Sequence, residues 1–152
     1  LAYDKYKKGF GNDWVKEVEM EEIFQSADIL TLHIPLDSHT KHIVNSDYIQ
    51  SFVRNIILMN LSRGAVVCTK DVSDALESGR ISGFCADVLE NENPLRMSVS
   101  ENDWFEKLIK RNNVILTPHV AGWSAESYVR ISEVLAASMI CEHARILDER
   151  LL

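Results

Sequence analysis

Cysteine is scarce in this sequence, and its spacing argues against two kinds of scaffold. The 152 residues contain only Cys68, Cys85 and Cys141, an odd number with no CxxC pair and no cysteine–histidine spacing of the kind that binds zinc. Neither a disulfide framework nor a metal site is therefore indicated. We expect the three thiols to be small buried apolar side chains.

Long apolar runs and basic clusters are also lacking. No run approaches the roughly 20 residues that span a bilayer, and the N-terminus has no charged start followed by an apolar signal core. The 16 Lys and Arg residues are outnumbered by 23 Asp and Glu, which gives a formal net charge of −7, and they form no patch dense enough to bind a phosphate backbone. We therefore expect a cytoplasmic protein with no membrane and no nucleic acid among its partners.

An initiating methionine is missing too, although the overall composition is that of a globular protein. The chain opens on Leu1, and the stretch LAYDKYKKG indicates the end of a strand that runs into a loop. We therefore expect a fragment whose beginning has been removed. Hydrophobic residues make up 46% of the sequence and charged residues 26%, which is typical of a soluble domain able to bury a core.

Short apolar runs alternate with helical patterns along the chain, which is typical of βαβ units and a parallel sheet. The expected strands lie at 27–35, 55–64, 81–88 and 113–119. Capping residues and spaced apolar side chains predict the helices. These lie at 15–26, 45–52, 69–80, around 103–109 and at about 124–150.

The predicted fold is an α/β domain with a Rossmann-like doubly wound parallel sheet. The strand runs are apolar at consecutive positions rather than at alternate ones, which indicates strands covered by helices on both faces. In such a sheet the first strand lies at the centre. With that strand missing, we expect LAYD to pair with the strand at 27–35, and the strands that end at Arg63, Asp87 and His119 to form a separate group.

Side chains capable of chemistry follow the ends of the predicted strands. They are Asp4, Arg63, Asp87, Glu92 and His119. In an open parallel sheet, ligands bind outside the carboxyl ends of the strands. Any one of these residues is more often a surface or structural group than a functional one. Their joint placement at one edge is what indicates a binding or catalytic site.

Four stretches follow one another along the chain: LHIPLDSHTKHIVN, NLSRGAVV, SGRISGFCADVLENENP and NVILTPHVAG. They resemble the successive signatures of the D-isomer-specific 2-hydroxyacid dehydrogenases, the family of the phosphoglycerate, D-lactate and glycerate dehydrogenases. The resemblance covers nearly the whole chain. It implies an NAD-dependent enzyme that transfers a hydride between NAD(H) and a small D-2-hydroxy acid or 2-keto acid, and that works as a homodimer.

The same resemblance defines the domain. Residues 1–152 would form a partial NAD-binding domain, from the end of its second strand onward, and the helix at about 124–150 would lead back toward a substrate domain. The family holds the cofactor pyrophosphate on a GxGxxG loop, which would lie roughly 20 residues before Asp4. Because the chain does not include that position, we expect the isolated fragment to bind NAD weakly and to be inactive.

The resemblance also implies the catalytic residues. Arg63 would bind the substrate carboxylate and help to polarise the carbonyl group, because a planar guanidinium meets a carboxylate with two parallel hydrogen bonds. His119 would protonate the carbonyl oxygen, and an imidazole titrates near neutral pH. Glu92 would hydrogen-bond the imidazole and favour its protonated form. The family usually has proline directly after this glutamate, whereas Asn93 intervenes here, so Glu90 remains an alternative.

The cofactor-binding residues implied by the resemblance also follow the strand ends. Asp4 would accept hydrogen bonds from the adenosine ribose and repel a 2′-phosphate, which favours NAD over NADP. Pro35 and Thr40 would lie along the adenosine, although both also have a structural interpretation, as a strand end and a turn cap. The remaining members, at the nicotinamide ribose, the carboxamide and the ring, are Leu61, Ser62, Arg63, Asp87, His119 and Gly122.

Two other functions stay open at this point. The first is an NAD(H)-binding regulator of the same fold without significant turnover. The second is a small interaction domain without chemistry. The other histidines are interpreted as structural or surface residues; they are His33, His39, His42 and His143.

Overall fold

The computed structural model describes residues 1–92 and 98–149. Asn93 and Pro94, on which the choice between the two glutamates depends, lie outside the described residues. The chain divides into two compact units, Leu1–Pro118 and His119–Leu152. Each unit is described by itself.

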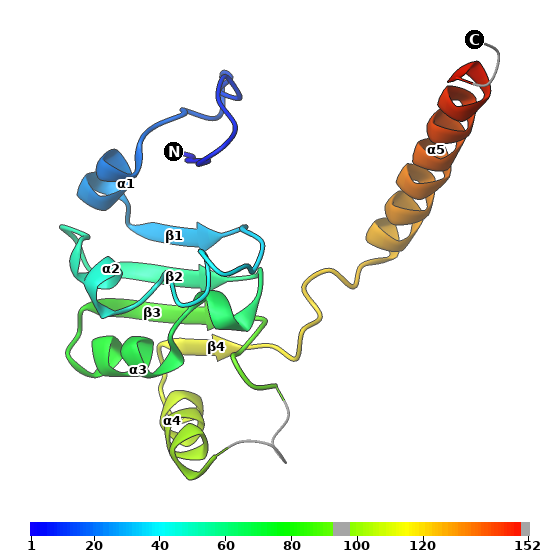
Figure 1. The fold of residues 1–152 in the computed structure, drawn as a ribbon. Coiled ribbons are helices and arrows are strands. Elements are labelled where there is room, and N and C mark those ends of the chain that lie inside the picture. The colour runs from blue at the N-terminus through cyan, green and yellow to red at the C-terminus, as the bar shows by residue number, and fades with distance from the viewer. Residues whose placement is uncertain (93–97, 150–152) are drawn as a thin grey trace. The chain divides into compact units, whose positions relative to one another are not determined.

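The first unit contains a four-stranded parallel sheet (Figure 1). Its strands are β1 (Ile29–Leu32), β2 (Ile56–Asn60), β3 (Ile81–Ala86) and β4 (Val114–Leu116), and they lie side by side in the order in which they occur in the chain. All three neighbouring pairs are parallel. The prediction of a Rossmann-like parallel α/β sheet is confirmed.

The predicted pairing of LAYD with the strand at 27–35 is wrong. β1 instead pairs with β2, with Leu30 opposite Leu58, so that the sheet is continuous from β1 to β4. Ala2 forms an isolated parallel bridge with Glu17. Leu30, Leu58 and Phe84 lie in register across three strands and are all buried. This shared apolar row explains why β1 joins β2, and it depends on contacts between distant segments that the pattern of a single strand does not reveal.

Four helices accompany this sheet, and a short 3-10 turn, η1 (Gly64–Val66), follows β2. The helices are α1 (Met20–Ser26), α2 (Ser46–Gln50), α3 (Thr69–Glu77) and α4 (Val99–Ile109). The predicted Asn45 cap is present, because its side chain accepts a hydrogen bond from the Tyr48 backbone N–H. Gly79 follows α3 with a φ of 75°, a left-handed conformation that glycine adopts readily at helix ends.

The first predicted helix is shorter than the sequence suggested. The apolar spacing predicted a helix over 15–26, but α1 spans only Met20–Ser26. The Asn12 side chain accepts hydrogen bonds from the backbone N–H groups of Trp14 and Val15, and Glu17 bridges to Ala2. These contacts hold the preceding residues in a turn and an extended segment, so the helix begins later.

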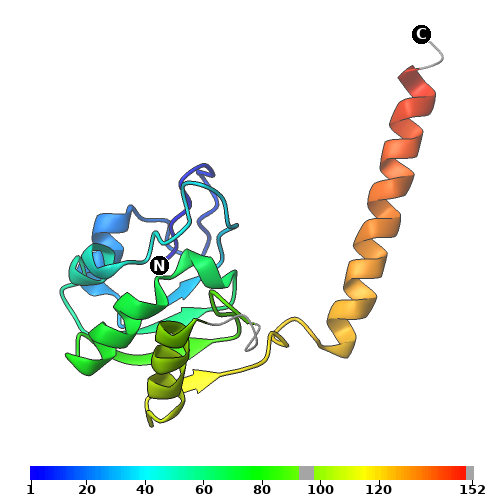
Figure 2. The ribbon, with the colours of Figure 1, turned by 60° about the horizontal axis from the view of Figure 1, so that its bottom comes forward.

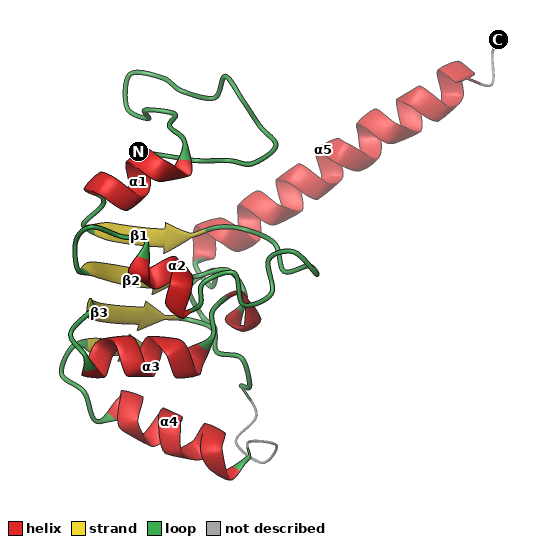
Figure 3. Cartoon of the chain, turned by 60° about the vertical axis from the view of Figure 1, so that its left-hand side comes forward, coloured by secondary structure: helices red, strands yellow, loops and turns green. Residues whose placement is uncertain are grey.

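The helices of the first unit cover one face of the sheet (Figure 3). That face carries the buried core, to which Ile23 of α1, Ile49 of α2, Val72 of α3 and Leu108 of α4 contribute. Figure 2 shows α3, in green, and α4, in yellow-green, beside each other against the strands. The described helices of residues 1–118 all lie on this face.

Within the described residues 1–118, no helix covers the opposite face of the sheet. It carries Ile29, Ile57 and Ile115, which are 57%, 36% and 62% exposed. Their apolar side chains explain why the runs appeared apolar at consecutive positions. The sequence pattern thus identified apolar side chains on both faces of the sheet. The helices of residues 1–118 bury those on one face.

The second unit consists of a short loop and α5 (Ala125–Glu149). Ser124 caps the helix as predicted, because its hydroxyl accepts a hydrogen bond from the Ser127 backbone N–H at 3.1 Å. Cys141 is exposed, and Cys68 and Cys85 are only partly buried, so the expectation of three buried thiols is wrong. In the part of the chain that the structure describes, no helix combines the length and the apolar character needed to cross a membrane.

Candidate active site

Because the strands are parallel, their carboxyl ends lie at one edge of the sheet, and the turn after β2 is the best-organised segment there. Asn60, the last residue of β2, is 1% exposed. Its Nδ2 donates to the Arg63 carbonyl oxygen at 3.0 Å, and its Oδ1 accepts hydrogen bonds from both the backbone N–H and the hydroxyl of Ser62. This buried amide fixes the turn from Leu61 to Arg63. Asn60 was not among the predicted site residues, although an amide that ends an apolar strand is a recognisable signal in the sequence.

Arg63 and Gly64 follow this turn. The Arg63 side chain is exposed, and its Nη1 donates to the Ser62 carbonyl oxygen at 2.8 Å. A Cβ atom on Gly64 would lie 1.9 Å from the Leu89 carbonyl oxygen and 2.6 Å from the Glu90 backbone nitrogen. Only glycine allows two backbones to approach so closely, so the turn that carries Arg63 is pressed against the segment that follows β3.

The loop after β1 is closed by its own hydrogen bonds. The Thr40 hydroxyl donates to the Pro35 carbonyl oxygen at 2.7 Å and accepts from the Asp37 backbone N–H at 2.8 Å. Asp37 in turn accepts hydrogen bonds from the backbone N–H groups of His39 and Thr40, and these two bonds lower the pKa of its carboxyl group. Pro35 and Thr40, both predicted cofactor residues, are thereby held together.

An open hollow of about 620 Å³ lies at the ends of β1 and β2. This volume is in the range of small-molecule sites. Four of the predicted cofactor residues meet around it. The hollow is lined by His33, Ile34, Pro35, Leu36, Leu61, Ser62 and Arg63. It offers apolar surface, one hydroxyl group and one guanidinium group, which together suit a ring or sugar beside an anionic group.

Asp87 joins the ends of the three strands β2, β3 and β4. It is buried at the end of β3. Its backbone N–H donates to the Asn60 carbonyl oxygen at 3.1 Å, and its carboxylate accepts a hydrogen bond from the Thr117 hydroxyl. The Thr117 N–H donates to the Ala86 carbonyl oxygen at 3.0 Å. Asp87 is thus held at the carboxyl edge of the sheet, beside the residue that begins the turn to Arg63.

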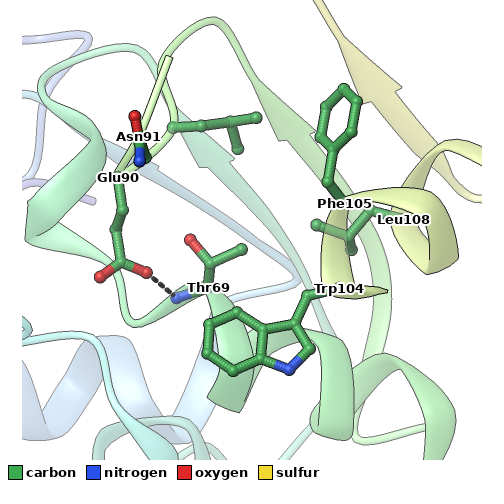
Figure 4. Close-up of a pocket in the computed structure, with 7 residues that line it drawn as sticks. Thr69, Glu90, Asn91, Trp104, Phe105 and Leu108 are labelled. Carbon is green, nitrogen blue, oxygen red and sulfur yellow. Dashed lines mark hydrogen bonds between the residues drawn. The ribbon is translucent and has the colours of Figure 1, made fainter. Parts of the chain in front are cut away.

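The two candidate glutamates have different surroundings. Glu90 is partly buried, with one carboxylate oxygen at 2.5 Å from His42 Nε2. Its other oxygen accepts a hydrogen bond of 2.6 Å from the Thr69 backbone N–H, at the first residue of α3 (Figure 4). Glu92 is exposed, two residues further along. Both oxygens of Glu90 are thus engaged with His42 and with the start of α3.

Asp4 lies apart from the four-stranded sheet, in the segment after the Ala2 bridge. Its Oδ1 accepts hydrogen bonds from the backbone N–H groups of Lys7 and Tyr6, each at 2.8 Å. These bonds, the one from Lys7 first, lower the pKa of the Asp4 carboxyl group. The exposed side chain is therefore an anion at neutral pH, as a ribose-binding carboxylate must be.

The two remaining candidates belong to the second unit. His119 is exposed and has a φ of 57°, in the left-handed region that few non-glycine residues adopt. The Gly122 carbonyl oxygen accepts a hydrogen bond from the Ser127 hydroxyl. In the described part of the chain, no cluster of three or more histidine, cysteine or acidic side chains could hold a metal ion.

Residues 1–121 match the family described as "D-isomer specific 2-hydroxyacid dehydrogenase, NAD binding domain". A 2-hydroxyacid dehydrogenase homolog of Schizosaccharomyces pombe is 35% identical over an alignment of 155 residues. The alignment covers 98% of this chain and 47% of that protein. A D-lactate dehydrogenase of Streptococcus pyogenes is 36% identical over 153 residues, covering 88% of this chain and 46% of the relative. The chain thus spans about half the length of these curated relatives.

Solved structures agree with the sequence comparison. A D-lactate dehydrogenase from Aquifex aeolicus, in complex with NAD and lactic acid, superposes with a TM-score of 0.74 at 26% identity, covering 96% of this chain and 46% of that one. A D-lactate dehydrogenase with NAD+ from Lactobacillus jensenii gives a TM-score of 0.75, again at 26% identity, covering 91% and 43%.

Proposed function

Because the chain belongs to the D-isomer-specific 2-hydroxyacid dehydrogenase family, as part of its NAD-binding domain, we propose that the protein containing it transfers a hydride between NAD(H) and a D-2-hydroxy acid or the matching 2-keto acid. The observation that carries the proposal is the hollow at the strand ends, where the exposed Arg63 adjoins Pro35, Leu61 and Ser62. A guanidinium can bind a carboxylate, and the hollow beside it combines polar side chains with the apolar surface of Ile34, Leu36 and Leu61, as a site for a keto acid and a dinucleotide requires.

The proposed roles follow from the chemistry of each side chain. Arg63 binds the carboxylate of the keto acid and orients its carbonyl group. NAD(H), when bound, supplies or accepts the hydride at the carbonyl carbon. His119 gives a proton to the carbonyl oxygen as the C–H bond forms, so that a hydroxyl group results, and it removes the same proton in the reverse reaction. Glu92 favours the protonated imidazole.

The residues around the hollow fit the cofactor. Ile34, Leu36 and Leu61 offer apolar surface to a sugar or ring face, and Ser62 and Arg63 line the same hollow. We propose that Pro35 and Thr40 face the adenosine, that Leu61 and Ser62 face the nicotinamide ribose, and that Asp87 and Gly122 serve the nicotinamide end. We also propose that the enzyme acts in the cytoplasm and that it is a homodimer. Sedimentation of the purified full-length protein measures its oligomeric state.

Asp4 should set the preference for NAD over NADP. In the full-length protein, we expect Asp4→Ser to raise the ratio of kcat/KM with NADPH to kcat/KM with NADH by about tenfold, because a carboxylate at this position repels the 2′-phosphate of NADPH and serine does not. The measurement is a steady-state assay with each cofactor. Asp13→Ser, which removes an exposed carboxylate of the same segment, should leave the ratio unchanged. An unchanged ratio in Asp4→Ser would contradict the assignment.

Glu92 and Glu90 are separated by their effect on the pH profile. Reduction of the keto acid needs a protonated imidazole, and a neutral amide no longer favours that form. We therefore expect Glu92→Gln to shift the alkaline limb of the kcat profile for reduction to lower pH. Glu90→Gln should leave the limb in place. The reverse pattern would transfer the role to Glu90.

The proposed function itself is tested by a turnover assay. Purified full-length protein is incubated with NADH and a panel of small 2-keto acids, and oxidation of NADH is followed by absorbance. We expect turnover on at least one acid. NAD binding without turnover on any acid would instead favour a regulatory protein of the same fold.

A further inference from the structure

Glu90 is not one of the proposed catalytic residues, yet both oxygens of its carboxylate have a defined partner. Its side chain is 23% exposed and contacts His42 Nε2 at 2.5 Å. The other oxygen accepts the Thr69 backbone N–H at 2.6 Å. This N–H is at the first turn of α3, where the helix itself provides no acceptor and a carboxylate is favoured by the helix dipole. In Figure 4 the carboxylate points directly at the start of α3.

His42 is itself fixed to the chain that follows the Arg63 turn. It has a φ of 52°, and its backbone N–H donates to the Ala65 carbonyl oxygen at 2.8 Å. Two residues later, Val44 forms a parallel bridge with Val67. The backbone that carries this imidazole is therefore held against Ala65 and Val67, which follow Gly64 by one and three positions.

The backbone beside Glu90 is held against the same turn. The Leu89 carbonyl group and the Glu90 nitrogen pack on Gly64 so closely that a Cβ atom there would overlap them. Further back, the Asp87 N–H donates to the Asn60 carbonyl oxygen. The segment from Asp87 to Glu90 thus has contacts with the Arg63 turn at both of its ends, and Glu92 is the second residue beyond the last of them.

We propose that Glu90 is a positioning residue: its carboxylate, held by His42 and by the first N–H of α3, fixes the segment that carries Glu92 against the turn that carries Arg63. The inference rests on the proposed function. Glu90 does not touch the reacting atoms in this account. It acts through the placement of Glu92 and Arg63, which must keep their geometry within a fraction of an ångström for efficient catalysis.

Substitutions at Glu90 separate this role from a purely structural one. Glu90→Gln keeps an oxygen for the Thr69 N–H and an amide group that reaches His42. Glu90→Ala removes both contacts. We expect Glu90→Ala to lower kcat for keto-acid reduction about tenfold, when kcat is measured at a temperature at which the variant is folded. A loss of this size is typical when a contact that supports a catalytic site is removed. Glu90→Gln should stay within about threefold of wild type by the same reasoning.

The KM for NADH should change little in Glu90→Ala. The Pro35–Thr40 part of the cofactor loop is closed by the Thr40–Pro35 bond and by Asp37, and neither depends on Glu90. Glu77→Ala, which removes an exposed glutamate at the end of α3, is the matched control and should behave as wild type. If Glu90→Ala does not fold, His42→Asn tests the same contact, because asparagine tolerates a positive φ but is too short to reach the carboxylate.

Hydrogen exchange gives a readout that does not depend on activity. We expect the Thr69 amide and the peptide spanning 87–92 to exchange faster in Glu90→Ala than in wild type or Glu90→Gln. Unchanged exchange, or a kcat within twofold of wild type in Glu90→Ala, would overturn the proposal. Equal loss in Glu90→Gln and Glu90→Ala would overturn it as well, because the charge rather than the contacts would then matter. Wild-type protein that turns over no keto acid would refute the proposed function instead, while the exchange rates still decide whether Glu90 holds the segment.

Discussion

Replacing His119 with alanine lowers the turnover number of the full-length protein by about 10²–10⁴, the usual cost of removing a general acid. The methyl group of alanine cannot deliver a proton to the carbonyl oxygen, and water must do so without the same placement. The backbone of His119 has a φ of 57°, a conformation that alanine adopts less readily than histidine. Alanine leaves the cofactor residues at the strand ends untouched, so NAD affinity should stay close to that of wild type.

Two measurements check this prediction together. Steady-state oxidation of NADH gives kcat, and a fluorescence titration with NAD gives the dissociation constant. His39→Ala, which removes another exposed histidine, is the control and should keep normal turnover. If His119→Ala kept near-normal turnover, His119 would not be the general acid.

Replacing Arg63 with alanine lowers kcat/KM for the keto acid by about 10²–10³, because a substrate carboxylate then loses its charged partner. The guanidinium lines the hollow beside Leu61 and Ser62, and its backbone is fixed by Asn60. Arg63→Lys should not restore the activity, because an ammonium group cannot form the two parallel hydrogen bonds that a guanidinium makes with a carboxylate.

The loss should appear mainly as a higher KM for the keto acid, while the KM for NADH changes less. Arg54→Ala is the matched control. Arg54 is exposed and pairs at 2.8 Å with Asp28, the residue that precedes β1, so it lies at the opposite edge of the sheet from Arg63. Recovery of normal kcat/KM in Arg63→Lys would contradict the proposed two-pronged binding.

The strands and their polarity could be predicted from the sequence because each is a local signal. The apolar run at 55–64 contains β2, and its parallel neighbours place all carboxyl ends at one edge. Arg63 and Asp87 follow directly from this, since each stands just after a strand. The length of α1 could not be predicted, because the bridge between Ala2 and Glu17 depends on two segments meeting in space.

Strand neighbours and supporting residues were beyond the reach of the sequence for the same reason. β1 joins β2 through the packing of Leu30 against Leu58, two segments nearly thirty positions apart. The contacts of Glu90 with His42 and Thr69 also connect parts of the chain that lie far apart in sequence, 48 and 21 positions away. The glycine in NLSRG can be read from the sequence. The close approach of the Leu89 backbone to Gly64 can be seen only in the folded structure.

The stereochemistry of the product tests the central claim most directly. Full-length protein is allowed to reduce a 2-keto acid with NADH, and chiral chromatography then identifies the hydroxy acid and its amount. We predict one equivalent of the D-2-hydroxy acid for each NADH oxidised, and formation of this acid about 10²–10⁴ times more slowly in a parallel reaction with His119→Ala. Formation of the L isomer, or of no hydroxy acid from any member of the panel, would contradict the account.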